Sequence, residues 1–193
     1  MKKLNRKGFT LIELLAVITI MGILMLVAVP AVQRTIRNTR RDTFADTAKQ
    51  YINAMKNSVV SDDLICWVNA TSGDRKHISA VADGTYYYFF NSSENTGKDL
   101  MEQGGASSWG NIAVRGLIQI SKSTVNNNTK YAYSITMVDG THGIGIFDNN
   151  TPTFVSEENL DRSAVSMSGK GFGTRTAMTN FSNQNKYSCV LVS

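Results

Sequence analysis

Two different apolar patterns occupy the first third of the chain. From Phe9 to Val32 nearly every residue is apolar, and Glu13 is the only charged one. This run matches the roughly 20 residues that an α-helix needs to cross a bilayer. In residues 33–61 apolar side chains recur at the spacing of one helix face. They are Phe44, Ala48, Tyr51, Ile52, Met55 and Val59. We therefore predict one long helix over about residues 9–61, apolar all round in its first half and amphipathic in its second.

The remainder, residues 64–193, has the composition of one β-rich globular domain. Aromatic and β-branched residues with period-two alternation predict strands. The candidate strands are 85–90, 112–120, 131–138, 143–147 and 187–192. The second, third and fourth are expected to form an antiparallel meander, with a turn that begins at Asp139-Gly140. Residues 91–111 and 156–186 are interpreted as surface loops, where we expect contacts with partners.

Glu13 is the residue that a simple membrane anchor does not explain. A charged side chain within a membrane-length apolar segment costs a few kcal/mol on insertion scales, about 2.5–3.5 for an aspartate at the centre, so it is a functional candidate by default. A secretory signal would have a shorter apolar stretch followed by a small-residue cleavage site, which Val29–Val32 does not provide. A segment that leaves the bilayer and packs against copies of itself could use the carboxylate.

The residues around this carboxylate, Gly8-Phe9-Thr10-Leu11-Ile12-Glu13, form a recognisable motif. It resembles the processing site of type IV pilins and pseudopilins, and the resemblance covers about residues 1–60. It implies cleavage after Gly8 by a membrane-embedded prepilin peptidase, followed by N-methylation of Phe9. It also implies that Glu13 sets the register of assembly by pairing with the new amine of Phe9 on a neighbouring subunit.

The same resemblance implies an α+β architecture, the type IV pilin fold, in which a long N-terminal helix packs against an antiparallel β-sheet domain. The expected parts are a leader at 1–8 that is removed, a transmembrane and filament-core half at 9–32, an amphipathic half at 33–63 and a head domain at 64–193. Gly22 and Pro30 are candidate helix breaks, because glycine lowers helix propensity and proline removes a backbone hydrogen bond. The alternative is that both are tolerated packing residues of a membrane helix.

Charge is concentrated at the N-terminus. The chain has a net charge of +5, and Lys2, Lys3, Arg6 and Lys7 contribute four of these charges. Without the leader, 16 basic and 15 acidic residues remain, so the overall charge does not indicate a nucleic-acid surface. Positive residues before an apolar helix favour an orientation with the N-terminus in the cytoplasm and the C-terminus outside.

A second basic group follows the apolar run, at Arg34, Arg37, Arg40 and Arg41. One interpretation is a solvated collar where the helix leaves the bilayer. The other is pairing between subunits with Asp42, Asp46 or acidic groups of neighbours. Binding to DNA or an anionic surface is weakened by the interleaved aspartates.

Cys66 and Cys189 are the only cysteines. In an external domain they are able to form a disulfide, which would join the base of the helix to the last strand. The alternative is two buried thiols that behave as small apolar residues. The even number and the expected compartment favour the disulfide.

The sequence predicts no enzyme, cofactor or metal site. The two histidines, His77 and His142, belong to no ligand or catalytic spacing, and His142 is interpreted as part of a turn. No phosphate-binding loop, zinc motif or nucleophile elbow occurs.

The resulting expectation is a structural subunit, the major pilin, of a type IV pilus for adhesion, motility, biofilm or DNA uptake. The alternative is a minor pilin or a pseudopilin of a secretion or competence system, and a third class is an enzyme or receptor anchored by this helix. The expected partners are further copies in a helical homopolymer, the prepilin peptidase, the assembly machinery and the cytoplasmic membrane, with a host surface or DNA as further candidates. The precursor would lie in the inner membrane and the assembled protein on the cell surface.

Overall fold

A computed structural model describes residues 10–68, 73–91, 114–148, 151–167, 181 and 188–192. The chain divides into two compact units, residues 1–39 and 40–193. One helix, α1 (Leu11–Val60), contributes to both units, and its span agrees with the predicted helix.

The described part of the second unit also contains strands and two short 3-10 helices. The first five strands are β1 (Leu64–Trp67), β2 (Arg75–His77), β3 (Gly84–Asn91), β4 (Arg115–Val125) and β5 (Asn128–Val138). Four short strands follow: β6 (Gly143–Ile144), β7 (Ile146–Asp148), β8 (Thr151–Thr153) and β9 (Val155–Ser156). The last elements are η1 (Glu157–Asn159), η2 (Arg162–Ala164), β10 (Val165–Ser166) and β11 (Ser188–Leu191).

Within the described residues, one main sheet has the strand order β10-β6-β5-β4-β3-β11-β1-β2, with β9 also paired to β5. All its pairs are antiparallel except β11 with β3. The last strand thus enters the middle of the sheet, between β3 and β1, while β7 and β8 form a separate pair. The predicted α+β fold is confirmed, and the sheet is mixed instead of purely antiparallel because the terminal strand runs parallel to β3.

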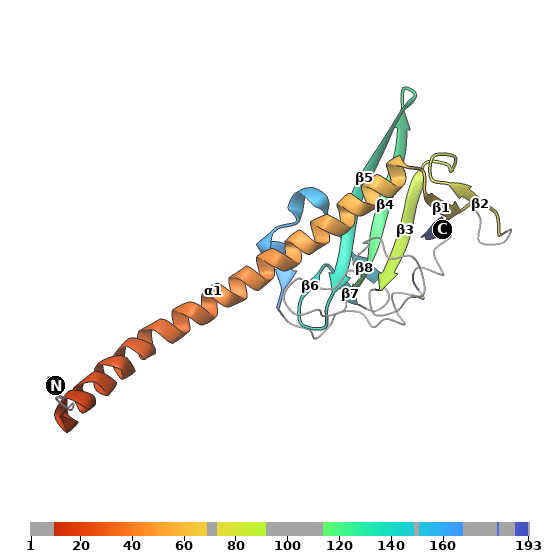
Figure 1. Ribbon diagram of the computed structural model, residues 1–193. Helices are drawn as coiled ribbons and strands as arrows, with labels where there is room; N and C mark the ends of the chain where they lie inside the picture. The colour runs from red at the N-terminus through yellow and green to blue at the C-terminus, as the bar shows by residue number, and fades with distance from the viewer. Residues whose placement is uncertain are drawn as a thin grey trace, which may run out of the picture. The chain divides into compact units, whose positions relative to one another are not determined.

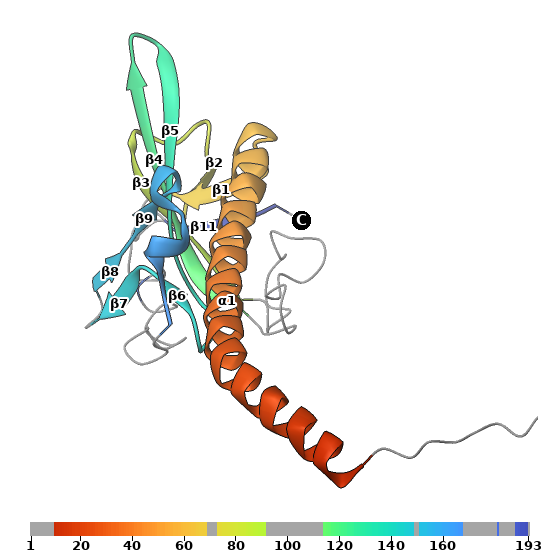
Figure 2. The ribbon, with the colours of Figure 1, turned by 90° about the vertical axis from the view of Figure 1, so that its left-hand side faces the viewer.

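The core of the second unit lies between the second half of α1 and one face of this sheet (Figures 1 and 2). Every residue of the predicted apolar stripe is buried. The stripe meets the inward side chains of the central strands, and the ring of Tyr51 stacks on that of Phe90 at 4.2 Å between centroids. The opposite face carries a smaller apolar cluster around Leu117 and Val138.

The predicted strands 85–90, 131–138 and 187–192 correspond to β3, β5 and β11. Strand 112–120 corresponds to β4, which extends to Val125, so β4 and β5 form a longer hairpin than the apolar pattern indicated. The prediction of a loop over 156–186 is wrong for its first part, because residues 157–166 contain η1, η2 and β10. Short polar turns of this kind have no periodicity to reveal them. Most of 91–111 lies outside the described residues.

Candidate functional site

The site residue with the clearest geometry is Glu13, in the first turn of α1. Its carboxylate accepts hydrogen bonds from the backbone N of Thr10 at 2.8 Å and from the Thr10 hydroxyl at 2.9 Å. In return the backbone N of Glu13 donates to Thr10 Oγ1 at 3.3 Å. This reciprocal pattern is a capping box, formed by a threonine and a glutamate three residues apart. The carboxylate therefore has hydrogen-bond donors within its own first turn, although no cation pairs with it among the described residues.

The surface around this box is apolar. Residues 11–37 of α1 are all exposed, including Leu11, Ile12 and Leu26. By length and composition, α1 is able to cross a membrane, and none of its most apolar window is buried. Monomeric soluble proteins rarely expose apolar patches beyond a few hundred Å², so a surface of this extent marks contact with a membrane or with other protein.

Comparison with known families identifies a motif in this segment. Residues 3–29 match the family model described as the prokaryotic N-terminal methylation motif. This motif is similar to the class III signal peptide of type IV pilins and pseudopilins. Comparison with curated proteins and with solved structures yields no similar chain.

The pilin motif implies processing by a prepilin peptidase, and it fits a membrane-anchored precursor. Gly8 and Phe9, the two residues at the expected cleavage site, lie outside the described residues. Cleavage between them and methylation of Phe9 therefore stay predictions.

Gly22 and Pro30 both lie inside α1, and the helix is assigned without interruption through them. No heavy atom lies within 4 Å of the position where a Cβ on Gly22 would stand, other than the helix's own neighbouring backbone. In this chain both are accommodated as helical residues, and local unwinding in an assembled filament stays a prediction.

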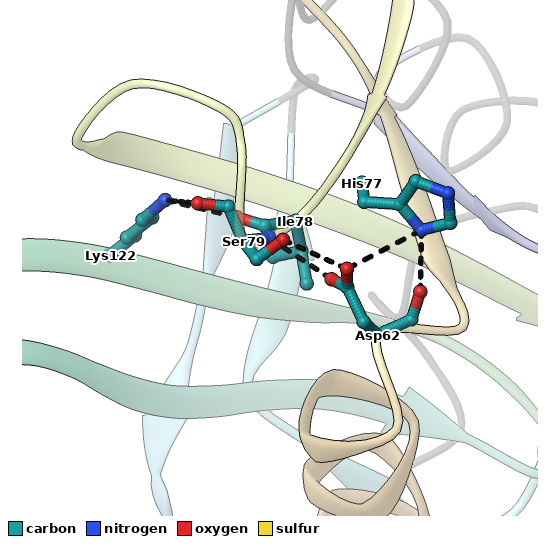
Figure 3. A network of polar contacts seen from close by, with 5 residues as sticks. All are labelled: Asp62, His77, Ile78, Ser79 and Lys122. Carbon is teal, nitrogen blue, oxygen red and sulfur yellow. Dashed lines mark hydrogen bonds and ion pairs between the residues drawn. The ribbon is translucent and has the colours of Figure 1, made fainter.

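The second unit contains a polar network at the C-terminal end of α1 (Figure 3). Asp62 follows the helix with a positive φ of 58°, and its carboxylate accepts hydrogen bonds from the backbone N and the hydroxyl of Ser79. The Nδ1 atom of His77 lies 2.6 Å from the carbonyl oxygen of Asp62. The network thus fastens the 77–79 segment to the end of the helix.

Lys122 of β4 extends this network. Its ammonium group is buried and donates to the carbonyl oxygens of Ile78, Ser79 and Val81 at 3.1, 2.7 and 2.7 Å. Three acceptors satisfy the three protons of the ammonium, which makes a buried lysine tolerable. Lys122 therefore holds the 78–81 turn against the sheet.

At the other end of the unit, Asp42 pairs with Arg162 of η2. The carboxylate accepts from both Nε and Nη2 of the guanidinium, which is a bidentate arrangement. This hydrogen bonding lowers the pKa of Asp42 and raises that of Arg162. Asp42 thus has a partner in its own chain, 120 residues away in sequence. Asp46 also has a cation nearby in its own chain, since its carboxylate lies 3.6 Å from the ammonium of Lys49.

Cys66 and Cys189 form a disulfide, and both residues are buried. They lie directly opposite each other in the pairing of β1 with β11. The bond therefore locks the last strand into the sheet next to the strand that follows α1.

A groove of about 580 Å³ lies between α1 and the edge of β5. Lys56 spans it, in an ion pair with Glu157 and 5.7 Å from the ring centre of Tyr133. Burial raises the pKa of Tyr133 to about 12. The ion pair between Lys56 and Glu157 holds η1 against the helix.

Sequence reasoning missed the roles of Lys122, Asp62 and Arg162. Only Lys122 left a signal, because it continues the inward alternation of Ile118 and Ile120 and so had to be buried. His142 lies in the turn between β5 and β6, as expected, and it is buried there with its Nδ1 3.0 Å from the Asp139 carboxylate. Within the part of the chain that the structure describes, no group of three His, Cys, Asp or Glu side chains is placed to hold a metal ion.

Proposed function

We propose that this protein is the major structural subunit of a type IV pilus, which assembles as a homopolymer through the first half of α1. The observation that carries the proposal is the wholly exposed surface of residues 11–32, which is apolar apart from Glu13 and Thr19. In a bilayer this surface faces lipid. Once the helix is extracted, only packing against other copies keeps the surface away from water, and that burial is worth about 25 cal/mol per Å².

Glu13 supplies the specificity that a uniform apolar surface lacks. Removed from water without a cation, its carboxylate would be strongly penalised, so a neighbour has to provide one. Cleavage after Gly8 would create an amine on Phe9 and remove four positive charges of the leader. We infer that Glu13 exchanges its hydrogen bonds with Thr10 for the Phe9 amine of the adjacent subunit, which selects one register between two helices.

Before assembly, the precursor would lie in the cytoplasmic membrane with its N-terminus inside and its head domain outside. Contacts between copies that do not close on themselves produce fibres, which carry the head domains to the cell surface. Adhesion, twitching, biofilm formation and DNA uptake are the activities that such a fibre would serve.

The deciding experiment is mass spectrometry of filaments sheared from cells, with intact and N-terminal peptide masses. We expect a dominant species that begins at methylated Phe9 and carries one disulfide. Trace amounts in filaments, or processed protein found only in membranes, would instead identify a minor pilin or pseudopilin. A mature protein that retains residues 1–8 would refute the filament role.

Replacement of Glu13 tests the assembly step separately. Glu13→Val is expected to be processed and held in the membrane but to assemble poorly, because the register-selecting charge is lost. Thr19→Val, on the same exposed helix, is the matched control and should assemble normally. Normal filament yield from Glu13→Val would contradict the proposed role of the carboxylate.

A further inference from the structure

The far end of the β4–β5 hairpin extends beyond the rest of the sheet. We call residues 123–130 the fingertip. Strand β3 reaches only as far as Lys122, opposite Gly84, and β9 pairs with β5 from Ser134 onward. All eight fingertip residues are exposed, including Val125 at 61%. Figures 1 and 2 show the hairpin passing the C-terminal end of α1.

The fingertip has a defined shape despite this exposure. Asn126 and Asn127 have φ angles of 53° and 62°, as a two-residue type I′ hairpin turn requires. At its base, Asp83 accepts hydrogen bonds from the backbone N and hydroxyl of Thr124 at 2.7 and 2.9 Å. The adjacent Lys122 is fixed by three carbonyl oxygens. A short exposed ribbon that is fastened in this way is preorganised for contact, which reduces the entropic cost of binding.

The opposite end of the same unit has a hollow. It is an open depression of about 520 Å³ lined by Arg41, Asp42, Asp161, Arg162 and Ser163. Beyond the bidentate pair of Asp42 and Arg162, the buried Nε of Arg41 has no hydrogen-bond partner among the described residues. Buried polar atoms in folded proteins nearly always have a partner, so this atom indicates a contact that the described residues do not provide.

The fingertip and the hollow lie at the two ends of the second unit, residues 40–193. Asp42, in the hollow, is near the start of the second unit. Val60, at the end of α1, is 18 residues further along the same helix, and the base of the hairpin lies at this end (Figures 1 and 2). At 1.5 Å per residue, Asp42 and the end of α1 are about 27 Å apart along the helix axis. A projection at one end and a hollow at the other form a heterologous pair of surfaces, which on repetition produces an open filament instead of a closed dimer.

We propose that the fingertip of one copy docks into the hollow of the next copy along the fibre; this rests on the proposed function. The chemistry of the two surfaces is complementary. The three asparagines of the tip offer amide donors and acceptors, and the hollow presents carboxylates and guanidinium groups together. Lys130 adds a positive charge at the base of the fingertip, opposite in sign to the two carboxylates of the hollow.

The contact is too small to act alone. A standard protein interface has about 20–30 residues on each side, and the fingertip has eight residues. It gains strength inside a fibre, where helix packing keeps the neighbour at a high effective concentration. The contact therefore sets the spacing of heads along the fibre and does not itself cause assembly.

Cysteine cross-linking in intact filaments tests the contact. Asn128→Cys at the tip avoids the two positive-φ positions, and Ser163→Cys lies in the hollow; both residues are exposed. Mild oxidation of filaments of the full-length, processed double variant should produce a ladder of reducible multimers, because each copy joins two neighbours. Mixed filaments of the two single variants should stop at the dimer.

The matched control combines Asn128→Cys with Gln50→Cys, which is exposed on α1 away from the hollow. It should remain monomeric. Filaments of the Asn128→Cys, Ser163→Cys double variant that have reactive thiols but form no multimers would overturn the proposal, as would dimers from Asn128→Cys alone, which would indicate contact between tips. If the double variant forms no filament, the mixed filaments of the two single variants decide the matter. Absence of a dimer in those mixed filaments would overturn the proposal too. Absence of any wild-type filament would refute the pilus function itself, so the two failures are distinguishable.

Discussion

Thr10 and Glu13 form a closed pair at the start of α1, in which each side chain accepts a hydrogen bond from the backbone N–H of the other. This pair gives the Glu13 carboxylate two hydrogen-bond donors from its own chain, but it supplies no positive charge to neutralise it. It also orients the Glu13 oxygens toward the N-terminus of the helix, which is where the amine of a processed neighbour would have to arrive.

The first prediction concerns Thr10. Thr10→Val keeps the shape of the side chain but removes its hydroxyl, so the first turn loses its cap at a cost of about 1 kcal/mol. We expect a lower yield of sheared filaments, with a smaller loss than for Glu13→Val, since the charge remains. Thr10→Ser retains the hydroxyl and should restore the yield. Equal yields for Thr10→Val and wild type would show that the capping box has no part in assembly.

The second prediction concerns the disulfide. It closes a loop of 123 residues, and the loss of such a bond is expected to lower the free energy of unfolding by about 3–5 kcal/mol. The Cys66→Ser, Cys189→Ser double variant should therefore unfold at a lower urea concentration in detergent. Reduction of the wild-type protein is the control and should produce a similar shift. A midpoint unchanged by either treatment would show that β11 is held by its strand pairing alone.

The third prediction concerns Lys122. Lys122→Met keeps the aliphatic stem but leaves three carbonyl oxygens, two of them buried, without their donor, which should cost about 2–4 kcal/mol. Lys130→Met, on the same hairpin but exposed, is the matched control and should change stability by less than about 0.5 kcal/mol. Urea unfolding measures both. Similar values for the two variants would mean that solvent replaces the lysine without cost.

The fourth prediction concerns acid. Hydrogen bonding to Arg162 lowers the pKa of Asp42 below its usual value of 3.8. The stabilising pair is thus fully present above that value and is lost as the pH falls through the lowered pKa. Stability of the wild type should therefore decline below about pH 4. Hydrogen bonds from Ser163 lower the pKa of Asp161 as well, so part of the decline belongs to that residue.

Asp42→Asn should flatten the acid side of the stability profile, because one of these carboxylates no longer titrates. Asp46→Asn, which alters only the exposed contact with Lys49, is the control and should leave the profile as in the wild type. Thermal unfolding between about pH 2 and pH 7 measures both. An Asp42→Asn profile that coincides with that of the wild type would assign the acid sensitivity elsewhere.

The sequence by itself determined the elements whose signal is local. The apolar run and the stripe from Phe44 to Val59 predicted α1, since helix periodicity repeats every few residues. Alternation predicted β3, β4 and β5, and the motif around Glu13 pointed to the family that the comparison then supported. Each of these features is encoded within a short stretch of chain.

Only the tertiary structure decided which distant residues meet. The entry of β11 between β3 and β1 places Cys189 opposite Cys66, and the fold of η2 brings Arg162 to Asp42. The turn at residues 78–81 wraps Lys122 with carbonyl oxygens that have no side-chain signature. These contacts depend on the order of strands in the sheet and on irregular segments, which share no periodic pattern, so their geometry exists only once the whole head has folded.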